Sequence, residues 1–395
     1  MFNVFTNSAR VLIREHLAQD RAEPPAVHRP RENEVAHYVV VGFGEMGQAF
    51  ALEAARLAHF ENTKRLRITI LDDKIDAKRN RFITRYPRFC PQALRLDDFD
   101  SAADDWAGKR YRPAAPCQVG DEEAVEYACN AEFLEMTADV PADRLADDLR
   151  QRLAPSSVQP SILVCFDDDG RNFETATLLQ AKLSDRRVNA PVYVWLPAQA
   201  SPTELRSTAS HSPPTPGDAA SSSLENVIPF GICEQSGTAE ESIRPGLEEL
   251  ARAVHEYYRE RFPHPAKASS KPWDELAASY RTANFLVAEH LEIKLLAIGR
   301  RRVPEAEAPP DQPRDAIAAH EERLIGHMEH NRWLAQQLLE GWSYGPERHE
   351  ERKQDPDICA WKHLPPERRE LDFAQVRHIP EILKKTPIRE CIVPA

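Results

Sequence analysis

The chain has 395 residues and a formal net charge of −12, with 51 Lys and Arg residues against 63 Asp and Glu residues. This length is typical of two or three domains. The negative charge argues against general binding to nucleic acid or to an anionic membrane, because both require dense positive charge. The seven scattered cysteines include no C-x-x-C pair, which indicates a reducing cytoplasm rather than a disulfide framework or a zinc ribbon.

Residues 1–34 precede the first predicted strand. The segment begins with a half-apolar, half-charged stretch, and prolines follow it. It is either a helix that connects the chain to a segment now absent or an amphipathic helix that lies on its own domain. The sequence has no run of about eighteen apolar residues, so it predicts no membrane-spanning helix.

The stretch VVVGFGEMGQAF, residues 39–50, carries Gly42, Gly44 and Gly47 in the spacing G-x-G-x-x-G. A β-branched run precedes these glycines, a helical pattern follows them, and RLRITILDD then predicts a second strand. Such a βαβ unit is typical of dinucleotide binding, because the glycines let the backbone approach phosphate at the helix N-terminus. The alternative is a turn with a structural role alone. The predicted cofactor contacts are Gly42, Phe43, Gly44, Glu45, Met46, Gly47, Asp72 and Asp73.

The end of the second strand indicates which nucleotide to expect. Asp72 is predicted to accept the ribose hydroxyls, and its charge beside Asp73 disfavours a 2′-phosphate. The expected cofactor is therefore NAD(H) or an adenosine nucleotide (ATP, ADP or AMP) before NADP(H), unless Arg79 reverses that preference. Glu45 lies inside the glycine loop, where its carboxylate argues against tight triphosphate binding unless it turns outward.

The first half continues as alternating strands and helices, which predicts an α/β domain with a parallel, doubly wound Rossmann-like sheet over residues 35–262. Residues 75–130 are read as an insertion, and the Ser/Pro-rich residues 200–223 as a mobile loop. Further strands are predicted at 131–140, 161–166, 191–197 and 226–230, with helices at 141–153 and 167–183.

Strand patterns end near residue 235. Helical patterns cover residues 242–262, 273–299 and 316–342, with Pro-rich breaks between them. A second, mainly helical domain is therefore predicted over residues 265–395.

The stretches VVVGFGEMG, ITILDD and ILVCFDDDGRNFETATLLQAKL resemble the RCK (TrkA-N) domain, a Rossmann-type regulator of potassium channels and transporters. The resemblance places Asp167, Asp168 and Asn172 beside the nucleotide crevice at the carboxyl end of the sheet. It implies that NAD(H) or an adenine nucleotide is bound without turnover, that the protein is a homo-oligomer, and that it acts on a membrane pore. A metal ion at Asp167–Asp169 is the alternative to N-capping and ligand contacts.

The stretch HNRWLAQQLLEGWSYGPERHEERKQDPDICAWKHLPPERRELDF, residues 330–373, resembles the RyR domain, a repeat of ryanodine receptors. The mixture of aromatic and basic residues indicates either a pocket that stacks a base and binds its phosphates or a plain helical core. His320, His327 and His330 lie near one helical face but lack the spacing of metal ligands. The predicted pocket residues are Trp333, Trp342, Tyr344, Arg348, Lys353 and Trp361.

Together the two resemblances imply a ligand-sensing regulatory protein that controls an ion channel or transporter through two nucleotide-type ligands. We expect it in the cytoplasm, at the inner face of the membrane if a pore-forming segment outside this chain or a partner anchors it. No Walker lysine, G-x-S-x-G elbow or Cys/His pairing is evident, so no catalytic residue is predicted. The alternatives are a sensor of nucleotide second messengers in bacterial defence against phage and an NAD-dependent oxidoreductase.

Overall fold

A six-stranded parallel sheet forms the centre of the first half of the protein. The structure is a computed structural model that describes residues 3–14, 30, 34–91, 125–136, 142–153, 158–196, 226–231, 245–261 and 268–395. The strands are β1 (Val35–Val41), β2 (Arg67–Asp72), β3 (Asn130–Glu135), β4 (Val158–Val164), β5 (Val192–Trp195) and β6 (Val227–Phe230). Their order is β3-β2-β1-β4-β5-β6, with every pair parallel. This is the doubly wound order predicted, and it places a topological switch point between β1 and β4.

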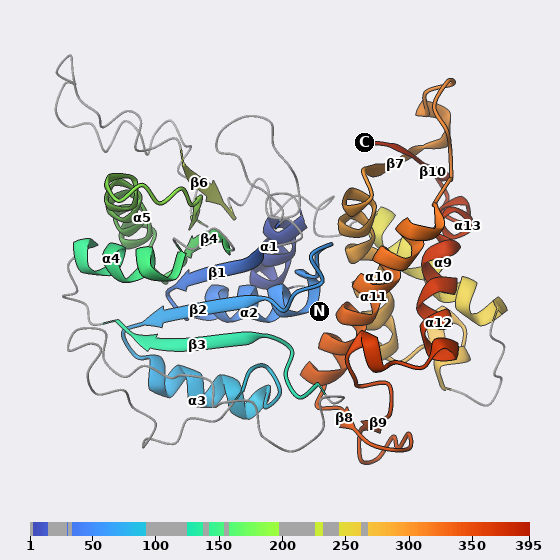
Figure 1. Cartoon of the computed structure of the whole chain (residues 1–395), viewed down its shortest axis with the longest axis horizontal. Helices are drawn as coiled ribbons and strands as arrows, with labels where there is room; N and C mark the ends of the chain where they lie inside the picture. Colours follow the sequence, from blue (N-terminus) through green and yellow to red (C-terminus); the bar gives the residue numbers. More distant parts are fainter. Residues whose placement is uncertain are drawn as a thin grey trace.

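Helices connect these strands on both faces of the sheet (Figure 1). Residues 75–85 were expected to begin an insertion, but they form a regular helix that follows β2. The predicted insertion therefore starts later, and residues 92–124 of it lie outside the described residues, as does the predicted loop at 200–223. The connecting helices are α2 (Glu45–Leu57), α3 (Ile75–Arg85), α4 (Ala142–Leu153) and α5 (Asp169–Asp185).

The second half is mainly helical, as predicted, but it also contains short strands. Strands β7 (Arg300–Pro304) and β10 (Glu390–Pro394) pair in antiparallel fashion, and β8 (Ser343–Tyr344) pairs with β9 (Gln354–Asp355). The expectation that strands end near residue 235 is thus wrong for these four segments: β8 and β9 have only two residues each, and RRRVP and ECIVP of β7 and β10 do not alternate between polar and apolar residues. The helices are α9 (Pro245–Arg261), α10 (Ala278–Ala297), α11 (Ala319–Leu339), α12 (Pro366–Arg377) and α13 (Ile379–Lys384).

Helix α9 packs against α10 and α13, so it belongs to the helical half, whereas the sequence analysis placed it in the first domain. An ion pair between Lys385 and Glu260 adds to this contact. A helix of this length carries an apolar face but no signal for the partner that covers it. Its assignment therefore depended on the tertiary structure.

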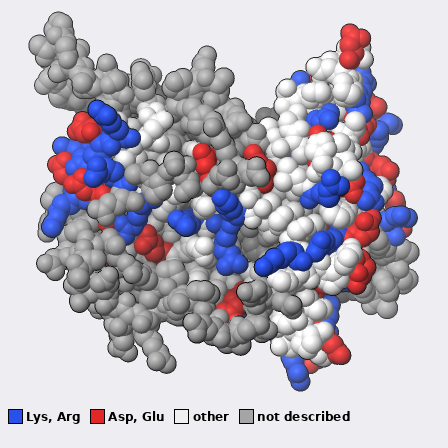
Figure 2. All heavy atoms as spheres, in the orientation of Figure 1, with Lys and Arg blue, Asp and Glu red and all other residues white. Residues whose placement is uncertain are grey.

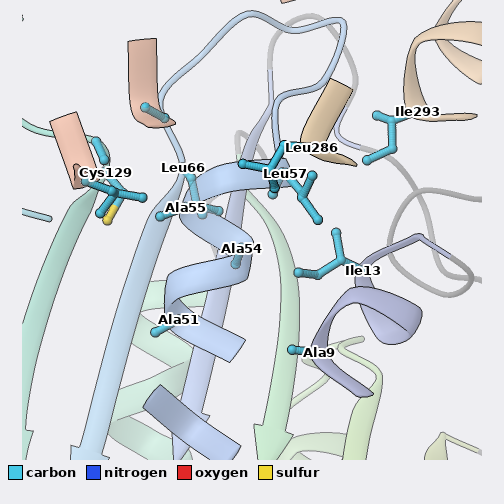
Figure 3. Close-up of a cluster of buried hydrophobic side chains, with 14 of the residues drawn as sticks. Ala9, Ile13, Ala51, Ala54, Ala55, Leu57, Leu66, Cys129, Leu286 and Ile293 are labelled. Carbon is cyan, nitrogen blue, oxygen red and sulfur yellow. The ribbon is translucent and has the colours of Figure 1, made fainter. Parts of the chain in front are cut away.

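Helix α2 is shared between the two halves. One apolar core runs from the sheet through α2 to α1 (Val4–Leu12), α10 and α11. In Figure 3, Ala9 of α1 and Ile13 lie beside the α2 segment that carries Ala51 and Ala54, and Leu286 of α10 lies near Leu57 at the end of α2. Helix α1 lies against α2, as one of the two alternatives for the N-terminal segment has it, and a connection to a further segment stays a prediction. The halves are therefore joined by a continuous core rather than by a linker alone.

Charged side chains reinforce this junction. Glu53 of α2 is 1% exposed and accepts hydrogen bonds from Arg10 Nε at 2.8 Å and from Arg56 at 2.6 Å. Arg10 also lies 3.4 Å from Glu289 of α10. Burial raises the pKa of Glu289 to about 7, Arg10 opposes this rise, and Glu53 adds to it. Two carboxylates thus share Arg10 at the point where α1, α2 and α10 meet.

The raised pKa of the buried Glu289 predicts that stability falls as pH rises. The native pKa of Glu289, about 7, exceeds its ordinary value of 4.5, so the folded state binds more protons between these values. The stability that protonated Glu289 provides is complete below pH 4.5 and is lost as pH rises through about 7. Relative to Glu289→Gln, the wild-type protein should lose on the order of 3 kcal/mol between pH 5 and pH 8.

Urea unfolding at a series of pH values measures this difference. Glu292→Gln serves as the control, because Glu292 lies on the same helix, is 28% exposed and pairs with Arg302. A constant difference between the wild-type and Glu289→Gln free energies of unfolding across the pH range would contradict the assignment.

Candidate functional site

The predicted glycine loop lies at the switch point between β1 and β4. Gly42 has a φ of +98°, a conformation that favours glycine. A Cβ there would lie 2.8 Å from backbone atoms of Cys165 and Phe166, and a Cβ at Gly47 would lie 2.1 Å from the Gly42 carbonyl oxygen. Gly42 and Gly47 are therefore required for the close packing of β1, β4 and α2.

Gly44 has a different role, because it is the N-cap of α2. No side chain donates or accepts a capping hydrogen bond there. A Cβ at Gly44 would meet no backbone atom but would lie 2.6 Å from Oδ1 of Asp167, an exposed side chain. The first turn of α2 thus has backbone N–H groups and a positive dipole end beside the crevice, which is the arrangement that attracts an anion.

The other predicted residues of the loop differ in their surroundings. Phe43 is fully buried between Phe82 and Phe133, and Met46 is 2% exposed, so both side chains belong to the core. The Glu45 side chain is exposed. Only the backbone of Phe43 and Met46 can therefore face a ligand.

Asp72 is buried, and its oxygens already have partners. It accepts hydrogen bonds from Phe43 N at 2.6 Å, Lys74 N at 2.9 Å and Lys78 Nζ at 2.7 Å. Burial alone would raise the pKa of Asp72, but these hydrogen bonds lower it below its ordinary value. With 1% of the side chain exposed, Asp72 holds the glycine loop against β2 and leaves no surface for ribose hydroxyls.

The neighbouring Asp73 remains 31% exposed and lies 3.6 Å from Arg171 of α5. The Arg171 guanidinium also lies 3.7 Å from the centre of the Phe166 ring. Since Asp73 follows β2 and Arg171 follows β4, their ion pair spans the end of β1. Sequence reasoning missed Arg171, although it lies within the stretch that carries the resemblance to RCK domains.

The residues after β4 have mostly structural roles. Asp168 caps α5 by accepting a hydrogen bond from Arg171 N at 2.6 Å. Asn172 is fully buried, and its side chain bonds with the backbone of Phe166 and with the carbonyl of Trp195. Asn172 therefore joins β4 and β5 to α5 and does not face the crevice, in contrast to the prediction. Among the described residues, no three His, Cys, Asp or Glu side chains form an arrangement suited to a metal ion.

The predicted RyR-like pocket does not form as one site. Trp342 is 8% exposed, and Cζ of the Arg348 guanidinium lies 4.9 Å from the centre of the Trp342 ring. Arg348 also pairs with the buried Asp355. Lys353 Nζ donates to the carbonyl of Glu340 at 2.7 Å and so caps the C-terminus of α11. These basic groups are engaged within the loop that links α11 to β9, and Tyr344 there is 39% exposed.

Trp333 and Trp361 belong to a separate aromatic cluster. The Trp361 ring stacks on His327 at 5.1 Å, and the Trp333 ring stacks on His330 at 5.9 Å. Nε2 of His330 donates to the carbonyl of Cys359 at 2.9 Å, so this histidine is a core residue. Of the six predicted pocket residues, Trp361 alone lines a cavity at the junction of the two halves, as far as the described residues show.

Because Gly44 and Gly47 have different surroundings, replacing each with alanine should lower the free energy of unfolding by different amounts. Gly47→Ala forces a Cβ against a backbone carbonyl and should destabilise the protein by about 1–3 kcal/mol. Gly44→Ala displaces only the end of the exposed Asp167 side chain and should cost less, on the order of 0.5 kcal/mol, because alanine is a poorer N-cap than glycine. Thermal and urea unfolding of both variants test this, and equal stabilities would show that the loop does not pack as described.

The comparisons with known proteins concern the second half of the chain. A family model described as the RyR domain matches residues 316–387, which include α11, α12 and α13. No curated protein matches the chain. The resemblance of the first half to RCK domains stays a prediction. The protein thus combines a Rossmann-like sheet with a helical half that carries a RyR domain.

Proposed function

We propose that the crevice between β1 and β4 binds the phosphate of NAD(H) or of an adenosine nucleotide, and that the protein senses this ligand without turning it over. The uncapped N-terminus of α2 at the switch point carries the proposal, because its N–H groups suit a phosphate. Because Gly44 has no side chain, the nearest atoms to its Cβ position are those of the exposed Asp167 carboxylate.

The surrounding charges modify this binding. The carboxylate of Asp167 lies over Gly44 and must turn away before a phosphate can approach. Because the Asp72 carboxylate already has protein partners for its hydrogen bonds, the partly exposed Asp73 is the residue that would accept the ribose hydroxyls. Arg171 supplies a cation at the same edge once its ion pair with Asp73 opens.

The RyR domain supplies the second ligand-binding unit of the proposed sensor. In the RCK resemblance, nucleotide binding controls a channel or transporter, and we propose the same output here through a pore-forming partner. None of the described helices is long and apolar enough to cross a membrane.

Calorimetry with NAD⁺, NADH, AMP, ADP and ATP tests the crevice. At least one of these nucleotides should bind the wild-type protein. Gly44→Val should weaken that binding by about tenfold or more, because the added methyl groups block the approach of phosphate. Asp167→Asn should strengthen it by about threefold to tenfold, since it removes a negative charge beside the phosphate.

Asp143→Asn is the control, because it removes an exposed carboxylate of α4, away from the glycine loop. Unchanged affinity in a folded Gly44→Val protein would refute the proposed site. Turnover of bound NADH with a panel of carbonyl compounds would favour an oxidoreductase instead.

The proposed regulation of a symmetric pore requires matched subunits, so we expect the protein to self-associate. Light scattering at micromolar concentration, with and without nucleotide, should report a dimer or a larger oligomer. A strict monomer under both conditions would contradict this part of the proposal.

A further inference from the structure

A cavity of about 210 Å³ lies at the junction of the two halves, away from the crevice. One wall comes from the connection between α2 and β2 and from the residues before β3. The other wall comes from α11 and the 3₁₀ helix η6 (Trp361–His363) of the RyR domain. The cavity is lined by His59, Thr63, Lys64, Arg65, Val125, Tyr127, Ala128, His327, Asn331, Leu334, Ala335, Leu338, Ala360 and Trp361.

The charge of this cavity is opposite to that of the protein. The chain carries −12 overall, yet among the described residues no Asp or Glu lines the cavity, whereas Lys64 and Arg65 do. Figure 2 shows several Lys and Arg side chains in the middle of this face, where the two halves meet. Neither Lys64 nor Arg65 forms an ion pair with a carboxylate among the described residues, while Arg10 and Arg332 at the same junction both do.

Arg65 is the less compensated of the two cations. Its side chain is exposed, and yet desolvation by the surrounding protein atoms lowers the pKa of its guanidinium. Both observations agree with its position in the lining of the cavity, a concave surface with protein atoms on several sides. A cation in such a place favours a bound anion, because an anion would supply the charge that no described side chain supplies.

The wall opposite the cations is aromatic. The imidazole of His327 stacks on Trp361 with an angle of 15° between the rings. Burial and the neighbouring His330 and Arg369 lower the pKa of His327 to about 4, so the imidazole is neutral at pH 7. Tyr127 lines the cavity from the Rossmann-like half. These rings suit a flat heterocycle, because any planar aromatic ring system can stack on an aromatic face.

Asn331 lies one helical turn beyond His327, on the same face of α11. Its carboxamide forms no hydrogen bond with any described residue, although it lines the cavity. A carboxamide offers two donors and one acceptor oxygen in one plane, which matches the edge of a purine such as adenine. The neighbouring Leu334 and Leu338 add apolar surface for the ring itself.

We propose that this cavity binds a purine nucleoside monophosphate. The purine lies against His327 and meets Asn331 at its edge, and the phosphate lies at Arg65 and Lys64. The volume is below the range of about 300–1,000 Å³ typical of sites for drug-sized ligands, which favours one nucleotide over a dinucleotide. This inference shares one element with the proposed function, namely that the RyR domain has a ligand of its own. It does not depend on nucleotide binding in the crevice.

Calorimetry with AMP, adenosine and inorganic phosphate tests the cavity, and all variants are made in full-length Gly44→Val protein to exclude binding at the crevice. AMP should still bind this protein. Arg65→Gln should weaken AMP binding by about tenfold or more while adenosine binding changes by less than about twofold. Asn331→Leu should weaken AMP and adenosine alike, because it removes the contact with the base rather than with the phosphate.

Arg67→Gln is the matched control, since Arg67 is an exposed arginine two positions away that does not line the cavity. Arg65→Lys keeps the charge and should retain most of the affinity for AMP, and thermal unfolding verifies that each variant is folded. The proposal is overturned if AMP does not bind Gly44→Val protein at millimolar concentration, or if Arg65→Gln and Arg67→Gln bind it equally. If the wild-type protein binds AMP and the Gly44→Val protein does not, the nucleotide belongs to the crevice. If both proteins bind AMP equally and no nucleotide binds at the crevice, the proposed function is refuted but the cavity proposal is not.

Discussion

The burial of α2 on two sides is the constraint on which the rest of the structure depends. One face of the helix lies on the sheet, and the other packs against α1, α10 and α11. Small residues such as Ala51, Ala54 and Ala55 allow these neighbours to approach closely. The helix begins beside the crevice at Gly44 and ends just before His59, which lines the junction cavity. Its thirteen residues span about 20 Å, so a single rigid element links the two candidate sites.

Buried charges are compensated almost everywhere around this helix. Glu53 lies between Arg10 and Arg56, and in the helical half Glu329 lies between Lys294 and Arg332. Burial would raise the pKa of Glu329, but Arg332 and Lys294 hold it well below its ordinary value. Charges that are removed from water without such partners are costly. Lys64 and Arg65 of the junction cavity are exposed and have no carboxylate partner among the described residues, whereas Arg348 and Lys353 of the loop between α11 and β9 are engaged within the protein, so the cavity suits an anionic ligand better than that loop does.

The residues of the glycine loop serve packing first. Gly42 and Gly47 are required by contacts within the protein, Asp72 holds the loop, and Asn172 joins two strands to α5. Packing therefore requires Gly42 and Gly47 whether or not a nucleotide binds. A binding site is distinguished by polar groups that packing within the protein does not use. Here these groups are the uncapped N-terminus of α2 and the partly exposed Arg171 beside it.

The sequence by itself determined the parallel sheet, the position of the glycine loop and the RyR segment, because each depends on a local pattern of side chains. Only the tertiary structure decided that α9 belongs to the helical half, that Trp361 lies apart from Trp342, and that the segment around Arg65 faces α11. These facts depend on contacts between segments far apart in the chain. Burial, pairing and the loss of hydrogen-bond partners are properties of such contacts, and no periodicity in the sequence encodes them.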